Sequence, residues 1–355
     1  MATRSRLATM LAAVGLVLVA CTNSATPVPQ ATPSADVVTP TTDGTLPMPE
    51  LTVLRLGASI QEMSQFAPKL AEMAGIYRKY GIDVTITTFN ADGDALQALL
   101  SGQTDMGSVG AAGILNSRLT DSPARNINFQ KTKVIDAIFC GDGIRTAEEA
   151  KGKVWAVSTL GGTAHASVLL ALQALGLTDR DVMIQQVGGQ AVRLAALKSG
   201  AIACAPVDIL LKDELAALDI NLIVDLSTTG LQYPATGLAA QDGFLEKNPS
   251  TALVMAAANL EAQNMIFADP QQAAQHWGEY AQIDDAKALE QVIGAQDQIS
   301  RTMMWTDEAM VFTQEVMAIV SPGIMMVDPK SATDASFLER LVDIGFYRKL
   351  GVPLE

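Results

Sequence analysis

Short β-type runs alternate with amphipathic helical stretches in this chain from residue 52 to about residue 228. The residues at 52–58 and 82–89 predict strands, and Asp92 is placed to cap the helix that follows. This order of elements is typical of α/β proteins, in which helices cover mainly parallel sheets. The pattern predicts an α/β fold, followed from about residue 243 by helices.

A short internal similarity indicates that the α/β part contains two similar units. The sequence LQALLSG at 96–102 has a counterpart in LAALKSG at 194–200, and each follows a strand and a loop. A folded part of roughly 300 residues is also more than one core usually supports. We therefore expect two α/β lobes, formed by residues 51–140 with about 235–355 and by residues 141–234. Ligands of open α/β sheets bind at the carboxyl ends of the strands, so a cleft between the lobes is expected.

The first 50 residues predict export and attachment. Arg4 and Arg6 precede an uncharged apolar run that is typical of an export signal and too short to span a bilayer comfortably. The run ends in LVAC, which resembles the lipobox of bacterial lipoproteins, so residues 1–20 would be removed and Cys21 would carry lipid; an ordinary secretory signal is the alternative. Residues 21–50, rich in Thr and Pro, predict a tether. The lipid would hold the chain on the extracytoplasmic side of the cell membrane.

Charge and cysteine content narrow the classes of partner. The formal net charge is −14, which disfavours nucleic acid because nucleic-acid binding needs a basic surface. With Cys21 lipidated, Cys140 and Cys204 remain in an oxidising compartment, where they could form a disulfide. Both lie in apolar, strand-like runs, so two buried free thiols are an equal alternative.

The segment STLGGTAHAS at residues 158–167 is the strongest indication of a binding site. A strand enters a two-glycine turn that begins a helix, so backbone N–H groups and hydroxyls would face a ligand. This arrangement suits a carboxylate, a sulfonate, a phosphate or the polar edge of a heterocycle. The segment is neither a Walker A loop nor a GxGxxG motif. An ordinary tight βα turn is the alternative interpretation.

Three further corners have the same character. They are Gly188-Gly189-Gln190, the stretch from Val109 to Gly113, and the corner after the first strand, where Ser59 is the expected polar contact. Small residues allow a backbone to approach a ligand closely, although they also allow tight packing of a helix on a sheet.

Several consecutive segments between residues 52 and 240 resemble the nitrate, sulfonate, taurine and thiamine-precursor family of periplasmic binding proteins. They include GIYRKYGIDVTITTFNADGDALQALLSGQTDMGSVGAAG, AKGKVWAVSTLGGTAHASVLLALQALGL and VGGQAVRLAALKSGAIACAPVD. The resemblance implies a type II periplasmic-binding fold: two α/β lobes, joined by two crossovers, that close around a small ligand. It implies an ABC permease and its ATPase as partners. The course of the chain between residues 120 and 150 departs from the family and is left open.

The resemblance also implies which residues bind the ligand. Carried over position by position, they are Ser59, Val109, Gly110, Ala111, Ser158, Gly161, Gly162, Thr163, Ala164, His165, Gly189, Gln190 and Asp208. The expected protein is a monomeric lipoprotein that captures a small polar or anionic molecule of the sulfonate, nitrate, aromatic-acid or pyrimidine class. The ligand itself is not identified.

An enzyme is the less favoured interpretation. The chain has two histidines, His165 and His276, and neither a nucleophile elbow nor metal-ligand spacing is present. We expect no catalytic residue, no metal and no cofactor. Two alternatives stay open within the family: a receptor that feeds a sensor kinase, and a pyrimidine-precursor synthase-like enzyme, for which His165 would be the least unsuitable residue.

Overall fold

Two β-sheets organise the part of the chain described by this computed structural model, residues 43–354 without residues 61 and 142. The strands of the first sheet are β1 (Val53–Ala58), β2 (Asp83–Thr88), β3 (Met106–Val109), β4 (Ala124–Asn126), β5 (Lys131–Lys133) and β11 (Gln232–Gln241). Their order is β2-β1-β3-β11-β4, and β5 pairs with β11. β1 is parallel to β2 and to β3, whereas β11 is antiparallel to β3. The carboxyl ends of β1, β2 and β3 therefore lie at one edge of this sheet.

The second sheet has the same mixed character. Its strands are β6 (Asp136–Cys140), β7 (Val154–Val157), β8 (Met183–Gln186), β9 (Cys204–Asp208) and β10 (Asn221–Asp225). Their order is β10-β6-β9-β7-β8. β7 is parallel to β8 and to β9, whereas β6 is antiparallel to β9. The parallel strands again bring the residues after their carboxyl ends to one edge.

Two crossovers connect the sheets. The chain leaves the first sheet after β5, passes Val134 and Ile135, and enters β6 of the second sheet. It returns between β10 and β11 through the short 3₁₀ helix η4 (Ser227–Thr229). β6 thus belongs to the second sheet, so the first crossover lies a few residues before the division at residue 140 expected from the sequence.

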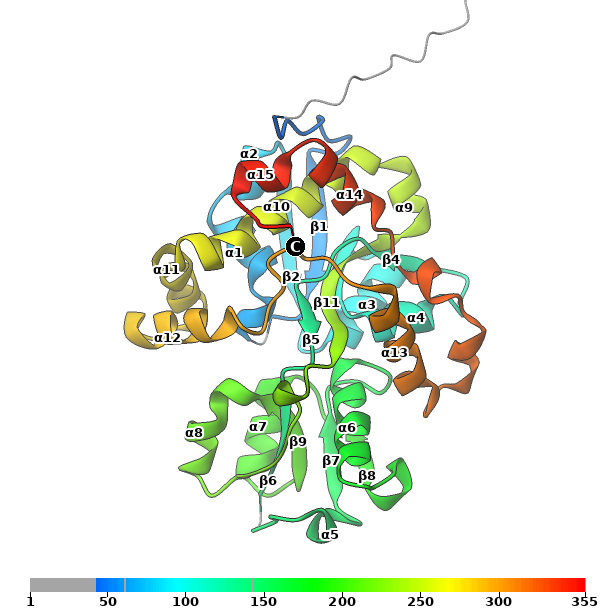
Figure 1. The fold of residues 1–355 in the computed structure, drawn as a ribbon, viewed down its shortest axis with the longest axis vertical. Helices are drawn as coiled ribbons and strands as arrows, with labels where there is room; N and C mark the ends of the chain where they lie inside the picture. The colour runs from blue at the N-terminus through cyan, green and yellow to red at the C-terminus, as the bar shows by residue number, and fades with distance from the viewer. Residues whose placement is uncertain (1–42, 61, 142, 355) are drawn as a thin grey trace, which may run out of the picture. The chain divides into compact units, whose positions relative to one another are not determined.

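Helices from both ends of the chain pack on the first sheet (Figure 1). The helices of this part are α1 (Ala67–Met73), α2 (Ile76–Lys79), α3 (Asp92–Leu100), α4 (Ala111–Ser117), α9 (Asp242–Lys247), α10 (Pro249–Ala268), α11 (Pro270–Ala281), α12 (Asp285–Ala295), α13 (Asp307–Ala318), α14 (Ser336–Asp343) and α15 (Phe346–Leu350). Leu56 of β1, Leu70 of α1 and Leu260 of α10 are fully buried in one core cluster. Within residues 43–354, no helix is long and apolar enough to cross a membrane.

Fewer helices belong to the second sheet, and each of them follows one of its strands along the chain. They are α5 (Ala147–Ala150), α6 (Thr163–Ala174), α7 (Gln190–Lys198) and α8 (Lys212–Ala216). α6 joins the parallel strands β7 and β8, and α7 joins β8 to β9. α6 packs on the sheet through a largely apolar surface, and Trp155 of β7 is fully buried in the same core cluster as Leu172 of α6. The alternation of strands and helices predicted from the sequence is confirmed.

A disulfide links the central strands of the second sheet. Cys140 of β6 and Cys204 of β9 are partners in the antiparallel register, with their Cα atoms 4.1 Å apart. Both residues are fully buried. The structure thus selects the disulfide from the two alternatives that the sequence left open.

The described end of the expected tether, residues 43–50, is bound to the C-terminal helices. The amide of Gly44 donates to the carbonyl of Ile344 over 2.7 Å. The carboxylate of Glu50 accepts hydrogen bonds from the amides of Ser250 and Thr251 at the beginning of α10. Burial opposes ionisation of Glu50, but these hydrogen bonds prevail and lower its pKa to about 2. Gly44 and Glu50 therefore belong to the folded part, although the sequence predicted a tether up to residue 50.

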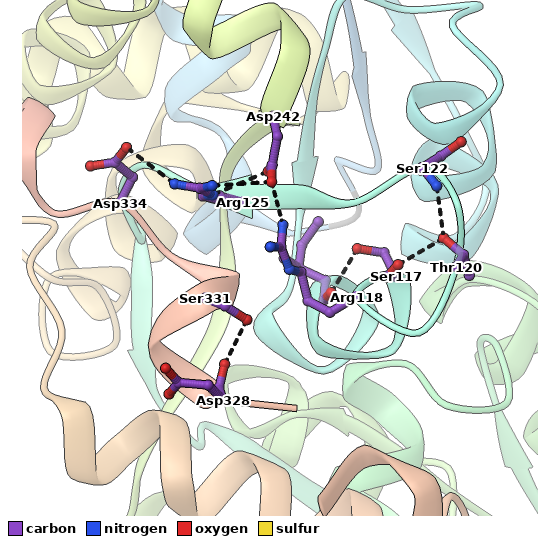
Figure 2. A network of polar contacts seen from close by, with 10 residues as sticks. Ser117, Arg118, Thr120, Ser122, Arg125, Asp242, Asp328, Ser331 and Asp334 are labelled. Atoms are coloured by element: carbon purple, nitrogen blue, oxygen red, sulfur yellow. Dashed lines mark hydrogen bonds and ion pairs between the residues drawn. The ribbon is translucent and has the colours of Figure 1, made fainter. Parts of the chain in front are cut away.

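A charged network joins four segments of the first sheet's layer (Figure 2). The carboxylate of Asp242, at the beginning of α9, accepts hydrogen bonds from Arg118 after α4 and from Arg125 of β4. Arg125 also lies 3.9 Å from Asp334 near the C-terminus. The side chains of Arg118 and Asp242 are mostly buried, at 15% and 17% exposure. This network fixes the position of β4 at the edge of the sheet.

Candidate functional site

Turns from the two sheets meet around two adjoining cavities. The larger cavity has a volume of about 580 Å³ and lies among the beginning of α3, the end of β3 and the turn between β7 and α6. The smaller cavity, which we call the polar chamber, has a volume of about 40 Å³ and lies among the residues after β1, β7 and β8. Asp92 and Thr163 line both. The cavities therefore lie at the carboxyl ends of strands, where the sequence predicted a ligand-binding cleft.

Most residues expected to bind a ligand line one of these cavities. Those that line the larger cavity are Val109, Gly110, Gly161, Gly162, Thr163 and His165. Those that line the polar chamber are Ser59, Ser158, Thr163, Ala164, Gly189 and Gln190. Ala111 and Asp208 line neither. Ala111 is fully buried at the beginning of α4, consistent with helix packing.

The turn between β7 and α6 uses two of its own amides internally. Gly161 has a φ of +80°, which favours glycine, and its amide donates to Nδ1 of His165 over 2.9 Å. The amide of Gly162, the N-cap residue of α6, donates to the carbonyl of Thr159. The expectation that these glycine amides face a ligand is therefore wrong, because each already has a partner within the turn.

His165 lines the larger cavity and carries a buried hydrogen-bond donor. Its side chain is 4% exposed, and burial lowers its pKa, so the ring is neutral near pH 7. Nδ1 accepts the hydrogen bond from Gly161, which places the ring proton on Nε2. Nε2 is buried and has no partner among the described residues. A ligand that carries a hydrogen-bond acceptor would satisfy this N–H group.

Close contacts join the two sheets beside the cavities. The hydroxyl of Thr163 donates to the carbonyl of Ala235 in β11 over 3.0 Å. A Cβ atom built on Gly110 would lie 2.3 Å from that carbonyl oxygen and 2.6 Å from Oγ1 of Thr163. A Cβ atom on Gly93, in the first turn of α3, would lie 2.4 Å from Cγ2 of Thr159. Gly93 and Gly110 lack a Cβ atom and therefore allow the turns at the strand ends of the two sheets to approach each other this closely.

The polar chamber contains a buried ion pair that the sequence did not indicate. Nζ of Lys131, in β5, lies 2.6 Å from Oε1 of Glu62, in the segment after β1, and both side chains are less than a tenth exposed. Burial opposes both charges, yet the pair raises the pKa of Lys131 and lowers that of Glu62. The ion pair therefore joins the segment after β1 to the first crossover.

Two carboxyl groups in this region have raised pKa values. Burial, reinforced by the charge of Glu62 and opposed by Lys131 and Arg193, raises the pKa of Asp92 to about 6. Burial and the charge of Glu62 raise the pKa of Asp208 to about 7. Both groups therefore lie where a negative charge is poorly compensated.

Asp208 acts through its neighbours. Its amide donates to Oε1 of Gln190, whose side chain lines the polar chamber. Its carboxylate accepts hydrogen bonds from the amide of Leu210 and from Nε2 of Gln298, which follows α12. Asp208 thus orients Gln190 and links β9 to the C-terminal region.

Sequence reasoning missed five charged residues around the polar chamber. They are Glu62, Asp92, Lys131, Asp136 and Arg193. Asp92 was noticed, but only as a helix cap, whereas Ala91 holds the N-cap position and Asp92 is the first residue of α3. Its position directly after the second strand and loop was the available signal. For Lys131, in the region whose course was left open, no local pattern indicated the site.

Among the described residues, no three His, Cys, Asp or Glu side chains lie together so that they could hold a metal ion. The charged groups instead form the Lys131–Glu62 pair and hydrogen bonds to neutral groups. Asp136, for example, accepts a hydrogen bond from the hydroxyl of Ser167.

Solved structures with the same fold include several solute-binding proteins. A structure from Bordetella bronchiseptica RB50 has a TM-score of 0.75 at 22% identity, and the match covers 85% of this chain and 99% of that chain. The periplasmic aliphatic sulphonate binding protein SsuA from Escherichia coli has a TM-score of 0.62 at 18% identity, covering 79% and 91%. The periplasmic nitrate-binding protein NrtA from Synechocystis PCC 6803 has a TM-score of 0.65 at 17% identity, covering 86% and 91%. These likenesses confirm the periplasmic-binding fold.

The sequence itself identifies the family. No curated protein is significantly similar to the chain. The family model described as NMT1/THI5 like matches residues 65–273, which include both crossovers and all but one of the expected ligand-binding positions. That span is more than half of the 355 residues. The chain therefore belongs to the NMT1/THI5-like family, in agreement with the resemblance seen in its sequence.

Proposed function

We propose that this protein is the solute-binding component of an ABC uptake system and captures a small polar molecule between its two sheets. The observation that carries the proposal is the meeting of strand-end turns from both sheets around two adjoining cavities. A volume of about 580 Å³ falls within the usual range for small-molecule sites, roughly 300–1,000 Å³. The fold shared with sulphonate-binding and nitrate-binding proteins supports the same role.

Capture would proceed by closure about the two crossovers. Thr163, which follows β7 of the second sheet, approaches Gly110 and Ala235 of the first sheet, and Gly93 of the first sheet approaches Thr159 of the second. These contacts would separate when the sheets move apart, which would open the cavities to solvent. The ligand would then stabilise the closed arrangement by adding contacts to both sheets. No bond is made or broken in this cycle.

The ligand would be one of the classes expected from the sequence: a sulfonate, nitrate, an aromatic acid or a pyrimidine. The polar residues Ser59, Thr163 and His165 line the cavities in which such a molecule would bind.

The cellular setting belongs to the same proposal. An ABC permease and its ATPase would receive the ligand from a monomeric receptor held on the extracytoplasmic side of the cell membrane. The signal at residues 1–20 and the lipid on Cys21 lie outside the described residues, as does most of the tether. A receptor that feeds a sensor kinase would use the same binding chemistry.

A pyrimidine-precursor synthase-like enzyme is a second candidate, favoured by one observation. His165 lines the larger cavity, burial lowers its pKa, and Nε2 has no partner among the described residues, so it is the group best suited to exchange a proton with a substrate. A change in the mass of a bound ligand during incubation would support this candidate. Release of the unchanged ligand would support the receptor.

A variant of Gly162 tests the location of the site. A Cβ atom on Gly162 would lie no closer than 3.4 Å to Thr159, so Gly162→Leu is compatible with the fold and would occupy part of the larger cavity. A bound ligand at 100 times its Kd adds about 2.7 kcal/mol of stability, which a thermal-shift screen detects. We expect Gly162→Leu to abolish the shift. Gly243→Leu, whose Cβ atom would meet nothing within 4 Å, is the control. Unchanged binding by Gly162→Leu would remove this turn from the site.

A further inference from the structure

The two sheets with their helices, here called the first and second lobes, also meet outside both cavities. In the second lobe, the 3₁₀ helix η3 (Ile209–Leu211) follows β9. A Cβ atom on Gly294 of α12, in the first lobe, would lie 2.9 Å from Cδ2 of Leu210. Nζ of Lys287, also in α12, lies 3.9 Å from Oε2 of Glu214 in α8. These residues line neither cavity, and we call this contact of α12 with η3 and α8 the α12 seam.

A buried hydrogen bond between side chains belongs to this seam. Asp208 is the last residue of β9, and Gln298 follows α12, next to Ile299 of the first lobe's core cluster. Nε2 of Gln298 donates to Oδ1 of Asp208 over 2.9 Å. The two residues are only 5% and 4% exposed. This bond therefore joins the lobes in a place that water hardly reaches.

Half of the Gln298 amide is unsatisfied in this arrangement. Its Oε1 is buried and has no partner among the described residues. An ionised carboxylate only accepts hydrogen bonds, so it cannot serve Oε1. The bonds that the Asp208 carboxylate accepts from Leu210 and Gln298 both end on Oδ1, so Oδ2 can carry a proton. A protonated carboxyl group can accept from Nε2 and donate to Oε1, which satisfies both ends of the amide.

The buried charges around Asp208 favour its protonated form. Burial and the charge of Glu62 raise its pKa to about 7, although Lys131 opposes this rise. Asp136, its register partner in β6, is a further carboxylate. Arg193, on α7, is hydrogen-bonded to the backbone of β9.

The remaining charges of the seam are exposed. The side chains of Glu214 and Lys287 are each about half exposed, at 47% and 48%. Asp213 in α8, Glu290 in α12 and Asp297 in the turn after α12 are exposed as well. Exposed charges interact weakly because water and salt screen them. The buried carboxyl group is therefore the one whose protonation changes the seam.

Resting on the proposed function, we propose that the α12 seam is a proton-dependent latch of lobe closure, in which protonated Asp208 pairs with the amide of Gln298 and holds the lobes together. One proton is taken up on closing and released on opening. Loss of this proton leaves Oε1 of Gln298 without a donor and favours separation of the lobes, which admits water to both side chains. The receptor thus holds its solute more tightly at mildly acidic pH.

The direction of the pH effect follows from the two states of Asp208. In the open arrangement the carboxyl group is hydrated, and its pKa lies near the ordinary value of about 4. In the closed arrangement the pKa is about 7. The ratio of closed to open protein is therefore lowest above pH 7, rises by up to about tenfold per pH unit below it, and levels off near pH 4.

The test measures lobe closure without any solute. Spin labels are placed at Met326→Cys in the first lobe and Met183→Cys at the beginning of β8, where the native side chains are 89% and 55% exposed. Cys21→Ala leaves only the introduced cysteines free to react, because Cys140 and Cys204 are bonded. Pulsed electron paramagnetic resonance then gives the distances between the labels. We expect the ratio of closed to open protein to be about 30-fold higher at pH 5.5 than at pH 8.5.

Variants separate the latch from other effects of pH. Asp208→Asn can accept from Nε2 and donate to Oε1 of Gln298 at every pH, so at pH 8.5 it should be as closed as the unaltered protein at pH 5.5. Adding Gln298→Met should remove this preference for closure. Asp213→Asn, at an exposed aspartate near the same seam, should respond to pH like the unaltered protein. Asp92→Asn, which removes the other buried carboxyl group with a raised pKa, should still respond.

The outcomes distinguish the latch from the proposed function. A pH response in Asp208→Asn equal to that of the unaltered protein, or one lost only in Asp92→Asn, would overturn the latch and leave capture by lobe closure intact. Closure of Asp208→Asn that persists after Gln298→Met would overturn the pairing of these two residues. A single fixed distance in every variant at both pH values would overturn the latch and count against capture by lobe closure as well.

Discussion

Replacement of Lys131 by methionine should destabilise the protein strongly. Lys131 and Glu62 form an ion pair at 2.6 Å, and their side chains are only 4% and 8% exposed. Lys131→Met would leave the carboxylate of Glu62 buried with only Ser64 as its close hydrogen-bond partner in the described structure. Loss of one partner from a buried pair costs about 3–5 kcal/mol because the remaining charge is uncompensated.

The magnitude can be isolated with a double-mutant cycle in urea. The free energy of unfolding would be measured for Lys131→Met, Glu62→Gln and the double variant. We expect the double variant to recover much of the lost stability, because it leaves no unpaired charge. Lys330→Met is the matched control: Lys330 pairs with Asp307 at the same distance, but the side chains are 70% and 57% exposed. Exposed pairs contribute about 0–1 kcal/mol.

The result that would refute this reasoning is a loss of less than about 1 kcal/mol in Lys131→Met, similar to that in the control. It would mean that water reaches Glu62, and that the polar chamber is not closed as described. A double variant no more stable than Lys131→Met would likewise show that the two charges do not act as a pair.

Three further predictions concern the close contact at Gly110, the disulfide and the effect of pH on stability. Gly110→Ala should lower the free energy of unfolding by about 1–3 kcal/mol, because its Cβ atom would meet the backbone of β11. The control Gly243→Ala should lie within about 0.5 kcal/mol of the unaltered protein. Equal stability of the two variants would contradict the close approach at Gly110. Replacing both Cys140 and Cys204 by alanine should remove about 4 kcal/mol, given their separation of 64 residues, and unchanged urea stability would show that they are not bonded. The pKa of Asp92 in the folded protein, about 6, exceeds its unfolded value, so the free energy of unfolding should fall as pH rises from about 4 to 6 and stay lower above that range. Asp92→Asn should remove up to ~3 kcal/mol of this decrease. Identical pH profiles of unfolding for the variant and the unaltered protein would refute this prediction.

The fold was largely predictable because its signals are local. The strand-type runs at 52–58 and 82–89 became β1 and β2, and the helix expected after Asp92 became α3. The boundary of the second sheet was less predictable, since membership of β6 depends on its pairing with β9 and β10, far along the chain. Pairing partners at such separations leave no local pattern.

Most of the residues expected to bind a ligand line the two cavities, but the charged residues around these cavities were not predicted. Glycine-containing turns at strand ends, such as Gly161 and Gly189, are visible in sequence and lie at the cavities. The partners of these groups are not visible: the amide of Gly161 is bonded to His165, and the polarity of the chamber comes from Glu62 and Lys131, which are 69 residues apart. Electrostatic environment depends on tertiary contacts, so the charged residues of the polar chamber could not be predicted from local sequence patterns.

A crystal structure of the protein with the small molecule that it retains would test the central claim most directly. The account predicts that the molecule lies between the two sheets and contacts Asp92, Thr163 and His165, which line the cavities. A bound solute located outside both cavities, with these three residues making no contact to it, would contradict the account.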